Sequence, residues 1–222
     1  MPRRRTIIAT GQFYHIFNKS VAAENIFTRA RTISRVLSLI DFYRFPVQIS
    51  YSLYNSLSAN LKNIRQKAIY SSAPVVLILA FAIMPSHYHF LVKQLVDGGI
   101  SSFISNFQNS FAKFYNIKYK REGSVFKARF KAVRIESEEQ LVHVSRYIHL
   151  NPVTSYLLDI EELGQYSRTS FTTYMNNKVY KLVETETIMR QFNNKRDLYG
   201  KFVQDQSDYQ RKLHEIKSLT FD

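Results

Sequence analysis

The sequence predicts an α+β domain in which a four-stranded sheet packs against helices. The first observation is the order of the periodic segments, which is strand, helix, strand, strand, helix, strand, helix. The second is the continuous apolar run at 75–81, which is typical of a central strand buried on both faces. The third is a length of 222 residues without a cysteine, which allows a sizeable core and excludes disulfides.

The first elements are a strand and a helix. Residues 12–19 are rich in β-forming side chains and include His15, which we interpret as a packed or hydrogen-bonded residue. Apolar positions recur at helical spacing from 28 to 43, which predicts the first helix. Residues 44–73 have no clean period, so we interpret them as an insertion that contains a short helix over 57–70.

Two adjacent strands follow at 74–83 and 87–95, and a long amphipathic helix is expected over 100–123. The segment 126–135 predicts the fourth strand, because apolar and basic residues alternate along it. One face of this strand is therefore expected to be apolar and the other cationic. The apolar positions are Phe126, Ala128, Phe130 and Ala132, and the basic positions are Lys127, Arg129 and Lys131.

The last helix of this part has clear signals at both ends. Ser137 can cap its first turn while Gln140 reaches back, which is the spacing of a capping box. The helix should end at Asn151, because the following Pro152 disfavours helical geometry in the residue before it.

This order is the βαββαβ plan of ferredoxin-like, or RRM-like, sheets with helices on one face. The helix over 137–151 is then an addition to that plan. We expect residues 1–152 to form the main domain and 153–222 to form a C-terminal helical extension. Its expected short helices include 183–192 and 196–204.

Charge is distributed unevenly along the chain. The formal net charge is +14, yet residues 153–222 hold ten acidic and ten basic side chains. Residues 1–152 hold 21 basic and 7 acidic ones, so they carry the whole excess. A cationic surface of this size favours a polyanion, and nucleic acid is the first candidate.

A membrane partner is the weaker interpretation of this charge. The longest apolar run, 73–84, is too short to cross a bilayer. Basic residues at 3–5 are followed by a mixed stretch and not by the apolar core of a signal peptide. We therefore expect a cytoplasmic, nucleoid-associated protein that does not bind membranes.

Two pairs of side chains predict an active site. His87 and His89 are two residues apart on a strand, so they share a face and can hold one metal ion. Tyr147 and Asn151 are four residues apart on a helix, so they also share a face. The Asn151 oxygen would complete a ligand set of two histidines and one oxygen. The roles of His143 and His149, on the same helix, stay open.

This set of groups suits covalent phosphodiester chemistry. A divalent ion can offset the charge that accumulates on a scissile phosphate while the tyrosine attacks phosphorus. The products are a 5′-phosphotyrosine and a free 3′-hydroxyl. Because the covalent link keeps the bond energy, the same site can rejoin the end to another strand without ATP.

Two motifs carry a family resemblance. Residues 85–89, Pro-Ser-His-Tyr-His, resemble the His-hydrophobe-His motif of the IS200-like single-tyrosine (Y1) HUH transposases. Residues 146–153, Arg-Tyr-Ile-His-Leu-Asn-Pro-Val, resemble the helix of their REP-associated tyrosine transposase branch. This resemblance implies that Tyr147 is the nucleophile. It implies His87, His89 and Asn151 as metal ligands, and single-stranded DNA near a hairpin as the substrate.

Further stretches extend the resemblance over most of residues 8–175. Residues 123–132 are similar to the family's Gly-His-Leu-Phe-Gln-Gly-Arg-Phe-Lys-Ala, and residues 13–19 match its first strand. Two features depart from the family. Lys127-Ala128 replaces Gln-Gly, and the tryptophan common at the position of 165–167 is absent.

Basic residues near these motifs are candidate DNA contacts. Aromatic residues at 115, 119, 126 and 130 are interleaved with them and offer surfaces on which unpaired bases could stack. The candidate DNA-binding residues are Arg3, Arg4, Arg5, Lys120, Arg121, Lys127, Arg129, Lys131 and Arg134.

The resemblance also guides the choice of cofactor and the alternatives. It favours Mg²⁺ or Mn²⁺, although imidazole ligands suit several transition ions. The protein could be a monomer or a homodimer. Two other functions stay open: a ferredoxin-like module that only binds nucleic acid, and a metal-dependent phosphodiester hydrolase in which water attacks. Tyr115 and Tyr119 are competing nucleophiles by residue type alone.

Overall fold

The computed structural model describes residues 8–176 and 179–205. The predicted Arg3, Arg4 and Arg5 contacts lie outside these residues. The strands are β1 (Phe13–Lys19), β2 (Val76–Ile83), β3 (His87–Gln94) and β4 (Lys131–Ile135). The longer helices are α1 (Ala30–Tyr43), α3 (Ala59–Tyr70), α4 (Gly99–Tyr119), α5 (Glu138–Thr154) and α8 (Arg196–Gln204). The shorter ones are η1 (Val21–Ala23), α2 (Tyr51–Ser56), η2 (Ile160–Gln165), α6 (Phe171–Tyr174), α7 (Glu186–Met189) and η3 (Arg190–Phe192).

The four strands form one antiparallel sheet in the order β2-β3-β1-β4. This confirms a mixed α and β chain with a four-stranded sheet and the predicted order of its elements. The two central strands, β3 and β1, pair so that Phe17 lies opposite His89 and Lys19 lies opposite His87. That register fixes which side chains of the two strands meet.

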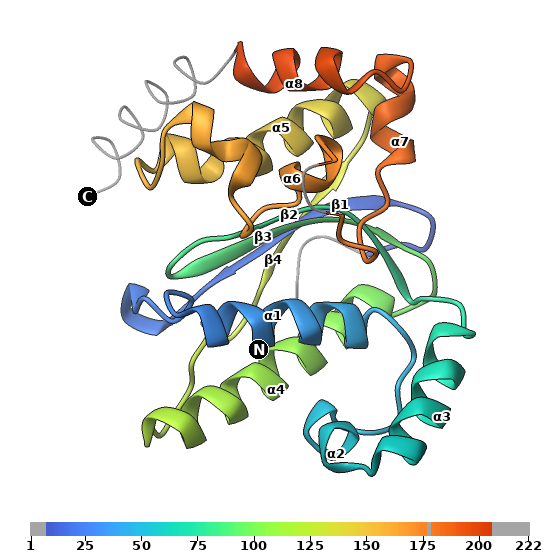
Figure 1. Ribbon diagram of the computed structural model, residues 1–222, viewed down its shortest axis with the longest axis vertical. Helices are drawn as coiled ribbons and strands as arrows, with labels where there is room; N and C mark the ends of the chain where they lie inside the picture. Colours follow the sequence, from blue (N-terminus) through green and yellow to red (C-terminus); the bar gives the residue numbers. More distant parts are fainter. Residues whose placement is uncertain (1–7, 177–178, 206–222) are drawn as a thin grey trace.

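The sheet lies between two layers of helices (Figure 1). On one face, α1 and α4 cover a core that includes Tyr14, Ile16, Tyr88 and Phe90. On the other face, α5 and the C-terminal helices cover a second core that includes Leu91. Side chains alternate along β1 and β3, so neighbouring residues of a strand belong to different layers.

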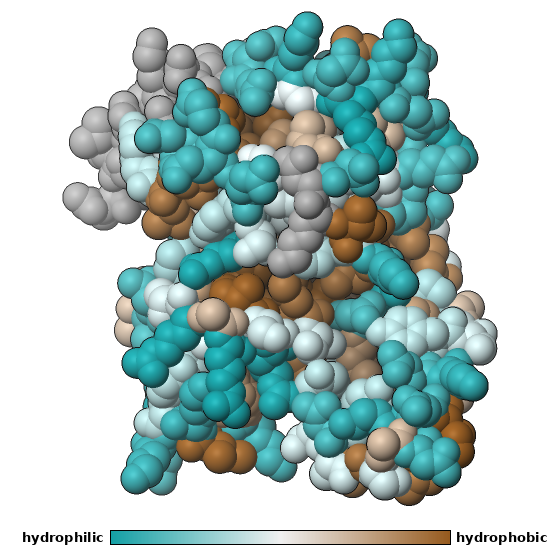
Figure 2. All heavy atoms as spheres, in the orientation of Figure 1, coloured by the Kyte–Doolittle hydropathy of each residue, from teal (hydrophilic) through white to brown (hydrophobic). Residues whose placement is uncertain are grey.

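Helix periodicity accounts for the first layer. The long helix α4 buries six large side chains at spacings of three and four, which places one continuous apolar stripe against the sheet. These residues are Ile100, Phe103, Ile104, Phe107, Phe111 and Tyr115. On the side of the molecule drawn in Figure 2, hydrophilic residues cover most of both outer layers, as expected for a solvent-facing surface.

The insertion differs from the rest of this layer. It folds into α2 and α3, and the second of these is the short helix expected over 57–70. Neither helix has a buried residue.

Among the described helices, none is long and apolar enough to cross a membrane.

Two predictions around the fourth strand were wrong. The helix α4 ends at Tyr119 and not near Gly123, because Lys120 takes the left-handed conformation (φ 50°) that ends the helix. The strand β4 begins at Lys131 and not at Phe126, which forms only an isolated bridge to Ser20. Val125 and Phe126 are both buried while Ala128 is exposed, so the expected alternation fails.

A side chain explains why the strand starts late. Asn18 donates its Nδ2 to the Lys127 carbonyl at 2.9 Å, and the Lys127 amide donates to the Lys19 carbonyl at 2.9 Å. These contacts hold the segment before β4 against the end of β1 in an irregular path. The regular ladder resumes only at Lys131.

The predicted end of α5 was also wrong. The helix continues through Pro152 to Thr154. Proline removes only the N–H that would bond the Ile148 carbonyl. The helical pattern continues after it, because the carbonyl of Asn151 accepts from the Ser155 amide at 3.0 Å and from Thr154 Oγ1 at 3.1 Å. Because Pro152 and Val153 are buried, packing also holds this last turn. At the other end Ser137 Oγ caps the Gln140 amide at 3.1 Å, as predicted.

Candidate active site

The candidate site lies on the face of β1 and β3 that is covered by α5. Along β3, Tyr88 and Phe90 point into the core under α1 and α4, whereas His89 belongs to the opposite face. Along β1, His15 and Phe17 lie on this same face, since both rings contact His89. Two central strands therefore place a group of aromatic and imidazole rings under one helix.

The predicted histidine pair shares a face. The ring centroids of His87 and His89 are 5.1 Å apart and their planes are nearly perpendicular. His87 Nδ1 is 3.2 Å from Ser86 Oγ. His89 is only 6% exposed, and its Nδ1 lies 2.9 Å from His15 Nε2. The period of two along a strand explains the pair, and the strand register brings in His15.

Helix α5 adds the tyrosine to this group. The ring of Tyr147 lies edge-on, 5.9 Å from His89 and 5.8 Å from His15 by centroids. Its side chain is 41% exposed, so a large substrate can reach it from solvent. Asn151, one turn along, is 6% exposed and donates its Nδ2 to the Tyr147 carbonyl at 3.5 Å. Its Oδ1 is the acceptor that remains for an ion.

Burial favours the neutral form of two of the site imidazoles, those of His15 and His89. Loss of hydration lowers the pKa of His15 to about 4. Burial also lowers the pKa of His89 well below its usual value, and the positive charges of His15, His87 and Lys19 act in the same direction. A neutral imidazole offers a lone pair, which is the form that binds a metal.

The donor types restrict what could hold a metal here. Across residues 8–176 and 179–205, no group of three or more His, Cys, Asp or Glu side chains could hold a metal ion. A three-ligand set built on His87 and His89 would therefore take its third donor from another residue type, such as the amide oxygen of Asn151. Two neutral nitrogen donors and one oxygen donor fit a divalent ion that keeps open positions for a phosphate.

His149 has a structural role within α5. It is fully buried, and its ring nitrogens lie 2.8 Å from Tyr199 Oη and 2.7 Å from Ser170 Oγ. Ser170 Oγ also accepts from the Phe81 amide at 2.8 Å. His149 thus joins α5 to α8, α6 and β2, and burial lowers its pKa to about 3.

His143 also faces away from the site rings. Its Nδ1 lies 2.7 Å from the guanidinium of Arg146, and its ring centroid is 5.6 Å from that of Phe202 in α8. The same Arg146 stacks on Phe202 and donates to its carbonyl. This side of α5 therefore holds the C-terminal helix, while Tyr147 faces the sheet.

Most of the predicted DNA contacts within the described residues are exposed. Lys131 lies above the ring of Phe17, 5.8 Å from its centroid, so its charge stands beside the histidines. Arg134 donates to Gln12 Oε1 at 2.9 Å. The other exposed members of the predicted set are Lys120, Lys127 and Arg129.

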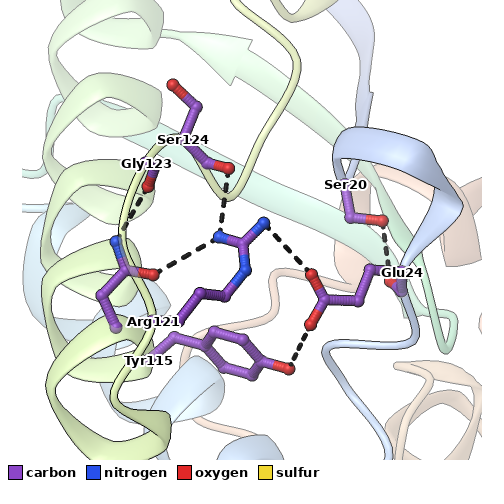
Figure 3. Close-up of polar contacts among 7 residues, drawn as sticks. Ser20, Glu24, Tyr115, Arg121, Gly123 and Ser124 are labelled. Atoms are coloured by element: carbon purple, nitrogen blue, oxygen red, sulfur yellow. Dashed lines mark hydrogen bonds and ion pairs between the residues drawn. The ribbon is translucent and has the colours of Figure 1, made fainter.

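Arg121 differs from the rest of the predicted contacts. Its guanidinium pairs with Glu24 at 3.2 Å and donates to the Ser124 carbonyl at 3.1 Å (Figure 3). Glu24 also accepts from Tyr115 Oη at 2.9 Å. These contacts brace the loop after α4 against the segment that follows β1. The pairing with Glu24 offsets the charge that a phosphate would meet at Arg121.

The aromatic residues near the basic stretch are largely core. Tyr115 and Phe126 are buried on the α4 side of the sheet, so they offer no open surface for bases. Burial, together with the bond to Glu24, raises the pKa of Tyr115 to about 12. Tyr119 and Phe130 are partly buried against the same core. Tyr115 is thus separated from the histidines by the sheet.

Sequence reasoning missed the contributions of β1 to the site. His15 was expected to be packed or hydrogen-bonded, which the structure confirms, but its partner His89 is 74 residues away. Phe17 stacks on His89 with centroids 5.6 Å apart. Both contacts depend on the register between β1 and β3, which no local pattern reveals.

An antiparallel sheet thus presents a histidine pair to a tyrosine on a covering helix. Residues 50–151 match a family model described as "Transposase IS200 like". Over this stretch of 102 residues the chain is similar to the IS200-like transposases. The family match supports a transposase function.

Two solved structures resemble this chain. A REP-associated tyrosine transposase bound to a REP hairpin aligns over 85% of this chain and 93% of its own, with a TM-score of 0.54 and 12% identity. At this identity the likeness shows the fold. A protein of Deinococcus radiodurans R1, described as a candidate transposase, aligns over 67% and 95% with a TM-score of 0.35 and 13% identity. No curated protein matches the sequence.

Proposed function

We propose that this protein is a metal-dependent enzyme that cleaves and rejoins single-stranded DNA beside a hairpin, through a phosphotyrosine on Tyr147. The observation that carries the proposal is the exposed Tyr147 ring held against His89 and His15. A nucleophile needs access to its substrate, and the lowered pKa values of the two histidines beside it favour their neutral form. In this proposal Tyr147 attacks the phosphate, and the neighbouring histidines bind the ion.

In the cleavage step Tyr147 Oη attacks the phosphorus of the scissile phosphodiester. A bond from Oη to phosphorus forms and the bond from phosphorus to the 3′-oxygen breaks. The phenolic proton leaves to solvent, and the 3′-oxygen keeps the electron pair and takes up a proton. A 5′-phosphotyrosine and a 3′-hydroxyl result, and attack by another 3′-hydroxyl reverses the step and joins two strands.

The residues that would hold Mg²⁺ or Mn²⁺ are His87, His89 and Asn151. When bound, such an ion would supply positive charge to the phosphate in the transition state. The chain itself keeps His89 neutral and orients its ring between Phe17 and His15. Lys131 and Lys19 add positive charge at the same face, which favours a phosphate there.

The proposal also includes the fold topology and the binding partner of this chain. We interpret the order β2-β3-β1-β4 as the ferredoxin-like plan, in which the two central strands carry the site. The structural relative was solved with a REP hairpin, and we take a DNA hairpin as the partner of this chain too. We place the activity in residues 1–152, with 153–222 as an extension, in a cytoplasmic protein that is monomeric or homodimeric.

The test is a covalent adduct on a denaturing gel. The protein is incubated with labelled single-stranded hairpin oligonucleotides and Mg²⁺ or Mn²⁺, and we expect Tyr147→Phe to abolish the adduct completely. Tyr119→Phe is the matched control and should leave the adduct unchanged, because Tyr119 is on α4. Cleavage that survives Tyr147→Phe would indicate a hydrolase. Binding with no adduct on any substrate would indicate a binding module.

A further inference from the structure

The proposed chemistry assigns no role to His15, although this residue lies in the candidate site. His15 lies on β1 with its Nε2 2.9 Å from His89 Nδ1, which is hydrogen-bonding distance. Its ring also lies 5.8 Å from that of Tyr147. It therefore contacts both the candidate nucleophile, Tyr147, and a buried candidate ligand, His89.

The register of the sheet explains how His15 reaches its partner. His15 lies opposite Leu91 and Phe17 lies opposite His89, so His15 and His89 are diagonal neighbours on the same face. Phe17 covers one face of the His89 ring while His15 meets its edge at Nδ1. The His89 ring is thus fixed by two residues of one neighbouring strand.

Chemistry decides what this contact can do. A neutral imidazole carries one N–H and one lone pair, and a half-turn of the ring exchanges Nδ1 with a carbon of nearly the same shape. Packing against Phe17 does not distinguish these two orientations. A hydrogen bond from Nδ1 does distinguish them, and it also leaves the lone pair on Nε2. Outer partners of this kind fix the tautomer and orientation of metal-binding histidines in general.

We propose that His15 is a positioning residue that accepts a hydrogen bond from His89 Nδ1 and so presents the His89 Nε2 lone pair to the site. The inference rests on the proposed role of His89 as a ligand. In the opposite arrangement His15 would donate to Nδ1, and His89 would carry its proton on Nε2 with no lone pair to offer. His15 acts through His89 and is not itself a ligand.

The first measurement needs neither metal nor DNA. Two-bond ¹⁵N–¹H correlation spectra of the metal-free protein assign the tautomer of each histidine. We expect the Nδ1–H form of His89 in the wild-type protein and a mixture of tautomers in His15→Leu, which has no acceptor. His15→Gln keeps an acceptor oxygen and should restore the Nδ1–H form. An Nε2–H form of His89 in the wild-type protein would overturn the proposal.

The second measurement is Mn²⁺ affinity by electron paramagnetic resonance. We expect His15→Leu to weaken binding by about tenfold to a hundredfold and His15→Gln to recover most of the loss. An affinity in His15→Leu within twofold of wild type would overturn the proposal. Electron spin echo envelope modulation of the bound Mn²⁺ detects the coupled histidine nitrogens, and three of them in the wild-type protein would make His15 a ligand and also overturn the proposal.

These outcomes separate the positioning role from the proposed function. If no hairpin gives an adduct but the tautomer and Mn²⁺ affinity change as expected, the positioning role stands and the phosphotyrosine chemistry fails. If the adduct forms and the His15→Leu variant matches the wild-type tautomer and affinity, the chemistry stands and the positioning role fails. Thermal unfolding of both variants measures any general loss of structure. If His15→Gln recovers the wild-type tautomer and Mn²⁺ affinity, a general loss of structure is excluded as the cause of the His15→Leu effect.

Discussion

At the scale of single residues, the hydrogen-bond partners of a buried histidine indicate whether it is free to bind a ligand or has a structural role. His89 and His149 are both buried, yet their partners differ in kind. His89 meets another imidazole beside an exposed tyrosine, whereas His149 is bonded at both nitrogens by hydroxyl groups. A histidine whose two nitrogens are both occupied has no lone pair to give to a metal. The open question about His149 is therefore answered by its partners.

The burial of His149 predicts a dependence of stability on pH. Its pKa is lowered to about 3 in the folded protein, below the usual 6.5. The unfolded chain therefore binds a proton that the folded chain does not, and stability falls as pH drops below 6.5. The loss from this group is about 2 kcal/mol between pH 7.5 and pH 5.

Urea denaturation at the two pH values, with a chelator present, measures this loss. His149→Gln can still bond both hydroxyls but does not titrate, so its free energy of unfolding should change less with pH by about that 2 kcal/mol. An equal pH dependence in the variant and the wild-type protein would show that other groups are responsible.

At the scale of elements, α5 is organised by its two sides. One side presents Tyr147 to the sheet, and the other is tied to α8 by a buried chain of hydroxyl and imidazole groups. In that chain Tyr199 Oη lies 3.0 Å from Ser145 Oγ and 2.8 Å from His149 Nδ1. Because one helix carries both sides, contacts with α8 fix the rotation of α5 and hence the position of the tyrosine.

Removing the central hydroxyl of this chain tests the coupling. We expect Tyr199→Phe to destabilise the protein by about 1–3 kcal/mol, because it leaves buried partners on Ser145 and His149 without their bond. We also expect slower formation of the Tyr147 adduct at a temperature where the variant is still folded. Tyr180→Phe removes the hydroxyl that donates to the Ser167 carbonyl away from α5, and serves as the comparison. A loss of stability with an unchanged adduct rate would show that α8 does not position the tyrosine.

The helices and strands also show which features local sequence patterns can predict. Strand period placed His87 with His89, and capping placed the start of α5, because both depend on residues within a few positions of each other. The start of β4 depends on Asn18, which lies more than a hundred residues from its partner Lys127. The end of α5 depends on burial of Pro152, and tertiary contacts outweigh the local preference there. Such long-range causes have no signature in a local pattern.

At the scale of the whole molecule, charge and fold place positive groups beside the site. All of the excess charge of +14 lies in residues 1–152. Lys131 stands over Phe17 on the face with the histidines, whereas Arg121 is paired with Glu24. Net charge therefore overstates the surface available to DNA, and Lys131 should contribute more to DNA binding than Arg121.

Salt dependence measures how many phosphates these residues neutralise. For single strands the slope of log affinity against log salt is about −0.7 for each phosphate contact. We expect Lys131→Gln to weaken hairpin binding and to make the slope shallower by about 0.7. Lys67→Gln, on the exposed helix α3, removes the same charge from another part of the molecule and should leave the slope unchanged. Fluorescence anisotropy with Tyr147→Phe as the common background measures binding without cleavage. Equal slopes for the two lysine variants would mean that DNA responds to net charge alone and does not contact the face that carries the histidines.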